Sequence, residues 1–151
     1  QYEEYLYQGF YPRLYNSTIL PSDFYSSYVQ TYLERDLTQL KHVHSRSTFH
    51  TFLKMCANRI GQIVNFTSLG ADCGISHNTA KEWISLLETS GIVFLIKTHH
   101  KNYNKCLIQM PKLYFSDRGL VAYLADIKSA DEIVTHPLKG GFLRHSSSEN
   151  F

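Results

Sequence analysis

Several motifs that would assign an enzymatic function are absent from this sequence. It contains no GxxxxGK[ST] phosphate-binding loop, no HExxH zinc motif and no GxSxG nucleophile elbow. A chain without the first motif cannot hold a nucleotide in the P-loop manner, and the other two are common signs of zinc proteases and serine hydrolases. We therefore expect no catalytic residue and no cofactor in this chain.

Cysteine is also scarce, with three residues and no CxxC spacing between them: Cys56, Cys73 and Cys106. The first two fall on predicted apolar helix faces, which favours buried free thiols in a reducing compartment. Two close histidine pairs, at 42/44 and 99/100, have no cysteine or carboxylate beside them at zinc spacing. No metal site is expected.

Long apolar runs and a strong excess of one charge are missing as well. No segment reaches the length of a membrane span and no signal peptide is visible, so we expect a cytoplasmic protein without a membrane partner. The net charge of +2 is too small to imply a polyanionic partner by itself, so any basic surface must be local. The 151 residues, 43% of them apolar, suffice for one sizeable domain or two small ones.

The most informative segment is 60–96, which predicts two short helices joined by a glycine turn and followed by a strand. Asn65 or Thr67 can cap the first helix, and Gly74 suits the left-handed backbone that ends it. Ser76 can cap a second helix over 77–89. The spacing of its apolar residues predicts one buried face, made of Ala80, Trp83, Ile84 and Leu87.

A β-ribbon is expected directly after these helices. Residues 92–96 read as its first strand, 98–105 as the loop and 106–108 as the returning strand, with a further short strand at 112–115. This order is that of a winged helix-turn-helix, which aims one helix at a DNA groove. Domains that only pack or dimerise have the same geometry, so that alternative stays open.

The remaining pattern is helical, and the fold class is mainly α with a small β-hairpin. A tyrosine-rich helix ends near Gly9, and an amphipathic helix of roughly five turns starts at Pro21, with Ser22 as its cap or Pro21 near it. Another helix opens at Ser47 and ends at Gly61, with one buried face formed by Phe49, Phe52, Leu53, Cys56, Ala57 and Ile60. We predict a helical segment over 1–46, the winged helix-turn-helix over 47–112, and the partly disordered start of a truncated domain over 113–151.

Six residues are candidates for contact with duplex DNA. On the second helix these are His77, Asn78 and Lys81, and on the loop they are Lys101, Tyr103 and Lys105. The sixteen residues from Lys97 to Lys112 contain four lysines and no acid, a composition that suits phosphate contacts. The alternative is a solvated loop whose lysines bind nothing, and Glu82 on the exposed helix face opposes phosphate.

Two charged positions have structural explanations that compete with functional ones. Arg35 and Asp36 lie within an aromatic helix, either as a buried ion pair or as groups presented to a neighbouring module. Asp117 follows a strand and precedes a short helix around Leu120, where an N-cap explains it without catalysis.

An ordered series of motifs also resembles a known family. It consists of 28–36 (YVQTYLERD), 52–53 (FL), 57–65 (AxRxGQxxN), 74–76 (GIS) with Thr79, 87–88 (LE), 111–120 (PKLYFxDxGL) and 149–151 (ENF). The series resembles the C-terminal half of a widespread prokaryotic family of AAA-like P-loop ATPases. In that family an ATPase module precedes a region with a winged helix and then a restriction-nuclease-like fold. The resemblance implies that residues 113–151 are the start of a truncated nuclease-like domain.

The resemblance implies that ATP and Mg²⁺ belong to an ATPase module outside this chain. Residues 140–148 (GGFLRHSSS) depart from the family pattern, and a truncated or decayed gene, or an artificially cut chain, would explain the departure. We expect a non-catalytic region that binds duplex DNA non-specifically on behalf of that ATPase. The alternative is a protein-interaction or homo-oligomerisation module of the same ATPase.

Overall fold

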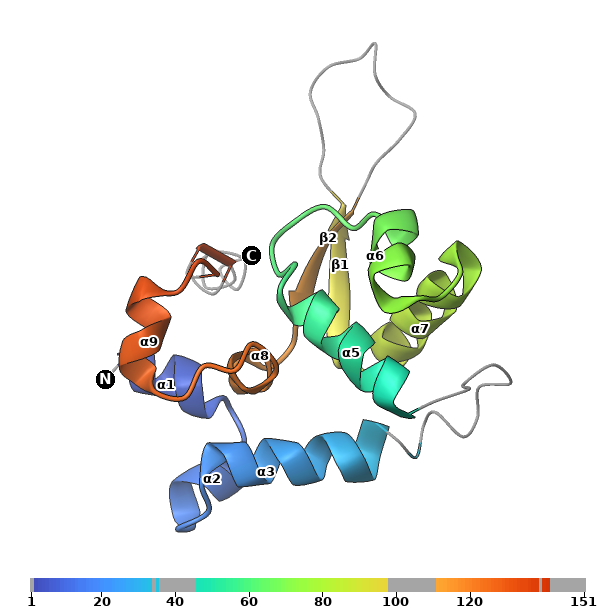
Figure 1. Cartoon of the computed structure of the whole chain (residues 1–151). Coiled ribbons are helices and arrows are strands. Elements are labelled where there is room, and N and C mark those ends of the chain that lie inside the picture. Colours follow the sequence, from blue (N-terminus) through green and yellow to red (C-terminus); the bar gives the residue numbers. More distant parts are fainter. Residues whose placement is uncertain (1, 34, 36–45, 98–110, 139, 142–151) are drawn as a thin grey trace.

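The computed structural model describes residues 2–33, 35, 46–97, 111–138, 140 and 141 (Figure 1). Within those ranges the chain is mainly helical, with one two-stranded antiparallel sheet. The elements are α1 (Tyr2–Gln8), α2 (Pro12–Asn16), α3 (Pro21–Tyr28), the π-helix η1 (Val29–Leu33), α5 (Arg46–Ala57), α6 (Phe66–Cys73), α7 (His77–Thr89), β1 (Val93–Lys97), β2 (Pro111–Phe115), α8 (Arg118–Leu124) and α9 (Ala130–Thr135). None of these helices combines the length and apolarity needed to cross a bilayer.

The elements form two halves that meet at α8. In Figure 1, α6 and α7 lie to the right of the ribbon of β1 and β2 and α5 crosses in front of its lower part, while α1 and α9 lie at the left and α2 and α3 lie below. Helix α8 contacts α1 and α3 in one half and α5 and β2 in the other. A single apolar core therefore runs through the molecule, from Leu6 on α1 to Trp83 on α7.

The ribbon has a different second strand from the one predicted. Strand β1 pairs with β2 in antiparallel register, from Val93 opposite Phe115 to Lys97 opposite Pro111. The segment 112–115, expected as a further strand, is thus the direct partner of β1. Residues 106–108, expected to return the hairpin, lie outside the described residues.

A third short segment adds to the outer edge of β2, which the sequence pattern did not indicate. The Gly61 and Val64 amides donate to the carbonyls of Leu113 and Pro111 at 2.7 and 2.9 Å, and the Leu113 amide donates to Gln62 at 3.1 Å. These bonds fix the chain just before α6 against the ribbon.

The helix observed from residue 21 differs from the predicted one in its cap residue and in its change from α-helix to π-helix. Leu20 is the N-cap residue, without a side-chain hydrogen bond, and Pro21 is the first helical residue, so Ser22 is not the cap. The α-helix ends at Tyr28, and the chain continues as the π-helix η1. Asp36 lies outside the described residues, so the predicted pairing with Arg35 stays untested.

Helix α9 lies where the sequence indicated little. It buries a single residue, Ile133, and one residue cannot show a helical period. Helix α5 has the predicted buried face but ends at Ala57, and Gly61 follows later with φ of 74°.

The predicted domain boundaries both fall inside elements, because α5 begins at Arg46 and β2 spans residues 111–115. The division into 1–46, 47–112 and 113–151 stays a prediction.

Candidate functional site

The connection between α6 and α7 is built from the residues that the sequence indicated. The Asn65 side chain caps α6 by accepting the Ser68 amide at 3.0 Å, and Gly74 ends it with φ of 68°. Ser76 caps α7 by accepting the Thr79 amide at 3.1 Å. These predictions are confirmed, and each cap satisfies a backbone donor that the helix itself leaves open.

The inner face of α7 is anchored by Trp83. Its indole meets the rings of Phe49 and Phe52 edge-on, with ring centroids 5.2 and 5.1 Å apart. Ala80, Ile84 and Leu87 are buried beside it, as predicted. Because these side chains are fixed in the core, the rotation of α7 about its own axis is fixed too, and so is the set of residues that faces solvent.

The outer face of α7 is polar and fully exposed. His77, Asn78, Lys81, Glu82 and Ser85 all lie on it, as the sequence predicted. A shallow hollow of about 540 Å³ runs along this face, lined by Asn78, Lys81, Glu82, Ser85, Leu86 and Thr89. The helix is therefore accessible along its length on the side away from the core.

The three candidate DNA-contacting residues of α7 are held differently. Nδ1 of His77 lies 3.0 Å from the Thr67 hydroxyl, and its ring meets Phe66 edge-on at 5.8 Å, so this residue is fixed to α6. The side chains of Asn78 and Lys81 make no hydrogen bond or ion pair with any residue that the structure describes. Their side chains are available to a ligand.

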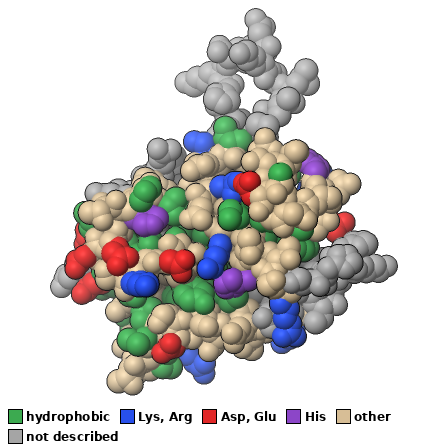
Figure 2. Space-filling view, in the orientation of Figure 1, with side chains coloured by type: hydrophobic (Ala, Val, Ile, Leu, Met, Phe, Trp, Pro, Cys, Tyr) green, Lys and Arg blue, Asp and Glu red, His purple; other side chains and the backbone are tan. Residues whose placement is uncertain are grey.

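The loop candidates Lys101, Tyr103 and Lys105 lie outside the described residues, and so do Cys106 and the four paired histidines. At the base of the ribbon, Lys97 is exposed and Lys112 is half-buried. Figure 2 shows positive and negative side chains interspersed on the visible face, without a field of one sign.

Asp117 has a larger role than the helix cap that the sequence predicted. Its Oδ2 accepts the Leu120 amide at 3.1 Å, which confirms the cap. The same oxygen accepts the Tyr25 hydroxyl at 2.5 Å, and Oδ1 accepts the Phe10 amide at 2.9 Å. We call these contacts the Asp117 clasp, since one carboxylate joins α8 to the N-terminal helices.

Tyr25 is completely buried in the clasp, and its hydroxyl also lies 2.9 Å from the Gln8 carbonyl. Burial, and then the neighbouring Asp117 carboxylate, raises the pKa of the Tyr25 phenol well above its ordinary value. The phenol therefore keeps its proton and remains a hydrogen-bond donor. The clasp is a structural joint rather than an acid–base pair.

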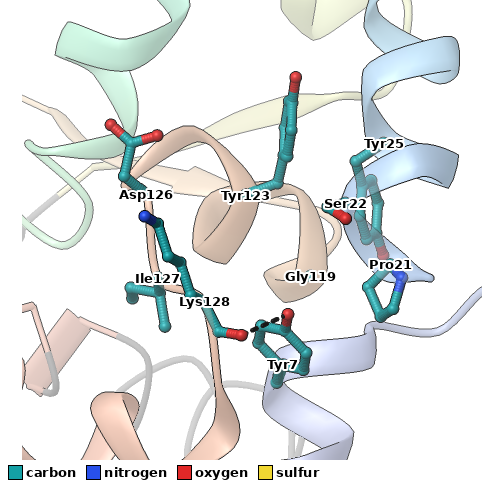
Figure 3. Close-up of a pocket in the computed structure, with 9 residues that line it drawn as sticks. All are labelled: Tyr7, Pro21, Ser22, Tyr25, Gly119, Tyr123, Asp126, Ile127 and Lys128. Atoms are coloured by element: carbon teal, nitrogen blue, oxygen red, sulfur yellow. Dashed lines mark hydrogen bonds between the residues drawn. The ribbon is translucent and has the colours of Figure 1, made fainter.

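A pocket of about 390 Å³ lies beside the clasp, between α1, α3 and α8 (Figure 3). Among its lining residues, the rings of Tyr25 and Tyr123 stack with their centroids 6.3 Å apart, and Tyr7 donates to the Lys128 carbonyl at 2.8 Å. Its charged side chains, Asp126 and Lys128, are exposed at the rim. None of the nine lining residues is a histidine or cysteine.

The described cysteines are not activated. Burial raises the pKa of the Cys56 thiol, and it raises that of the half-buried Cys73 as well. In the described part of the chain no three histidine, cysteine or acidic side chains come together in a group that could hold a metal ion.

An aromatic surface lies on α1, α2 and the turn between them. Tyr2, Tyr5, Phe10 and Tyr15 are between 45% and 56% exposed, and the Tyr5 and Tyr15 rings are 6.0 Å apart. In the clasp the Phe10 amide donates to Asp117, and the Tyr15 hydroxyl donates to the Gly9 carbonyl at 2.6 Å. These rings are thus exposed on a fixed backbone.

Comparison with known proteins places the chain in a family. A family model described as a domain of unknown function (DUF8612) matches residues 1–131, so the chain belongs to that family. It is similar to an uncharacterised protein of Mycobacterium bovis and to one of Mycobacterium tuberculosis. Each is 27% identical over 113 residues, which are 75% of this chain and 26% of the relative. The matched part thus spans about a quarter of the length of these relatives.

Proposed function

We propose that this chain is a non-catalytic DNA-binding region of a longer AAA-like ATP-binding protein. In this proposal α6 and α7 form a helix-turn-helix, and β1 and β2 are the strands of its wing. The observation that carries the proposal is the outer face of α7, which is polar and exposed while the opposite face is fixed against Phe49 and Phe52.

The order of the elements supports the same assignment. Helices α5, α6 and α7 are followed directly by the antiparallel ribbon, and residues 61–64 extend that ribbon on its outer edge. A winged helix-turn-helix needs this sequence of three helices and a small sheet. His77, Asn78 and Lys81 would then contact the groove, while Lys101, Tyr103 and Lys105 would contact the backbone.

The ATPase parentage is proposed from the motif series and from the length of the relatives. The chain has no P-loop of its own, and the matched part of each relative is 26% of that protein. The remaining length leaves room for an ATPase module, which would bind ATP and Mg²⁺. DNA held by the winged helix would be the substrate on which that module acts.

A salt titration of duplex binding tests the DNA-binding proposal. We expect non-specific affinity of roughly 10⁻⁴ to 10⁻⁶ M at physiological salt, falling as salt rises. Removing two phosphate contacts with Lys101→Ala/Lys105→Ala should reduce the log–log salt slope by about 1.8, since each neutralised phosphate contributes about 0.9. Fluorescence anisotropy of a labelled duplex measures both quantities.

The matched control is Lys54→Ala/Lys128→Ala, which removes the same charge away from the ribbon and should leave the slope unchanged. Absence of binding at about 50 mM salt would remove the DNA-binding proposal. A slope that both double variants leave unchanged would remove only the role of the loop.

A second function is favoured by the aromatic surface of α1 and α2. Contiguous exposed aromatic residues are typical of protein interfaces, where tyrosine supplies much of the binding energy. The chain would then be a protein-interaction or homo-oligomerisation module of the same ATPase. The fixed backbone beneath Phe10 and Tyr15 would lower the entropy lost on binding.

This second function predicts self-association that depends on the exposed rings. Tyr5→Ser/Phe10→Ser should weaken the association constant by about tenfold or more, because both rings would be removed from the interface. Sedimentation equilibrium over a range of concentrations measures it. Ile63→Ser/Val134→Ser, two equally exposed apolar residues elsewhere, is the control. A wild-type chain that stays monomeric throughout the range would exclude homo-oligomerisation.

A further inference from the structure

The outer face of α7 carries an uninterrupted row of side chains that can bond to base edges. Asn78, Lys81, Glu82 and Ser85 are separated by three, one and three positions, so they share one side of the helix. All four are exposed, and the first three have no partner among the described residues. The row includes amide, ammonium, carboxylate and hydroxyl groups, and each has a complementary base edge in the DNA major groove.

The exposed charges of α7 are unfavourable for DNA binding through phosphate contacts alone. Along α7 the exposed charged residues are Lys81, Glu82 and Glu88, one cation against two anions. A carboxylate turned toward DNA repels phosphate, and sequence-independent affinity depends on cations that neutralise phosphates. A hydrogen-bond donor that faces Glu82 in the bound duplex would offset this repulsion. In the major groove the cytosine N4 amine is such a donor.

We propose that α7 reads a G·C base pair in duplex DNA, with Glu82 accepting from the cytosine N4 amine and Lys81 donating to guanine O6 and N7. This inference rests on the proposed DNA-binding function and deepens it. It replaces sequence-independent binding by a preference for a G·C base pair. Phosphate contacts then belong to the ribbon, where Lys97 is exposed and Lys112 half-buried.

The helix is fixed well enough to direct these two side chains. Ser76 caps its first turn through Thr79, and the Thr67 hydroxyl holds His77 at its start. Trp83, the residue after Glu82, is buried between two aromatic rings. A side chain can discriminate between bases only from a backbone whose position does not vary, and α7 meets this condition.

Selection from a duplex pool with a randomised central stretch tests the inference. The whole wild-type chain should enrich sequences that share a G·C pair, and replacing that pair by A·T in a selected duplex should weaken binding roughly tenfold or more. Glu82→Ala removes the acceptor and should lose the preference for cytosine while still binding the pool. Glu88→Ala makes the same truncation outside the row and should keep the preference. Circular dichroism and thermal melting establish that both variants are folded.

The outcomes separate this inference from the proposed function. Binding to the pool without enrichment overturns the G·C preference and leaves DNA binding intact. Enrichment that Glu82→Ala leaves unchanged overturns the assignment of Glu82. Absence of binding to the pool at about 50 mM salt overturns the inference together with the proposed function.

Discussion

Replacing Gly9 by alanine should lower the free energy of unfolding by roughly 2–5 kcal/mol, through left-handed backbone strain and overpacking. Gly9 has φ of +80°, and an added Cβ would lie 2.0 Å from the Tyr25 hydroxyl and 2.5 Å from Asp117 Oδ1. Both neighbours belong to the clasp and cannot withdraw without breaking its hydrogen bonds. Urea denaturation, with the m-value checked for constancy, measures the loss.

Gly74 and Gly91 provide the matched controls. They have φ of +68° and +73°, and nothing lies within 4 Å of an added Cβ at either position. Gly74→Ala and Gly91→Ala should therefore show the backbone strain alone, roughly 1–2 kcal/mol. If Gly9→Ala proves no more destabilising than these two, the tight packing around Gly9 is refuted.

Asp117→Asn should lower the free energy of unfolding by roughly 2–4 kcal/mol, because the amide cannot replace both carboxylate oxygens. One oxygen accepts the Phe10 amide, and the other accepts from Tyr25 and Leu120. In either orientation the new NH₂ group faces at least one buried donor, which loses its acceptor. Chemical denaturation followed by circular dichroism measures the change.

A helix cap alone predicts a different result for the same substitution. Asparagine and aspartate are about equally good N-cap residues, so a residue that only capped α8 would tolerate the exchange. Asn65→Asp makes the reverse exchange at a side chain whose acceptor bonds only the Ser68 amide, and should change stability by less than about 0.5 kcal/mol. An equally small effect of Asp117→Asn would show that Asp117 contributes to stability only as the cap of α8.

Local chemistry made the α6–α7 region predictable from sequence. Asn65, Gly74 and Ser76 act on residues within four positions of themselves, and the buried face of α7 follows from helical spacing. A pattern of this kind needs no knowledge of the rest of the fold. The exposure of His77, Asn78 and Lys81 followed from the same spacing.

The clasp could not be predicted in this way. Asp117 meets Tyr25 and Phe10 across 92 and 107 positions, and no local rule links residues so far apart in the sequence. The one available signal was the cap position of Asp117, which explains one of its three contacts. The partner of β1 was misjudged for a related reason, because 106–108 and 111–115 are both apolar and pairing depends on tertiary packing.

Helix α8 lies late in the sequence but packs on both α1 and α3, with Leu120 and Val121 buried. The first third of the molecule is thus completed by residues near its other end. If the backbone is cut between η1 and α5, we expect the two fragments to stay associated, because α8 contacts α1 and α3. Excising the α5–β2 unit on its own would instead remove α8 from β2, a strand whose Leu113 and Phe115 are buried in the whole chain, so this unit depends on α8 to cover its apolar residues.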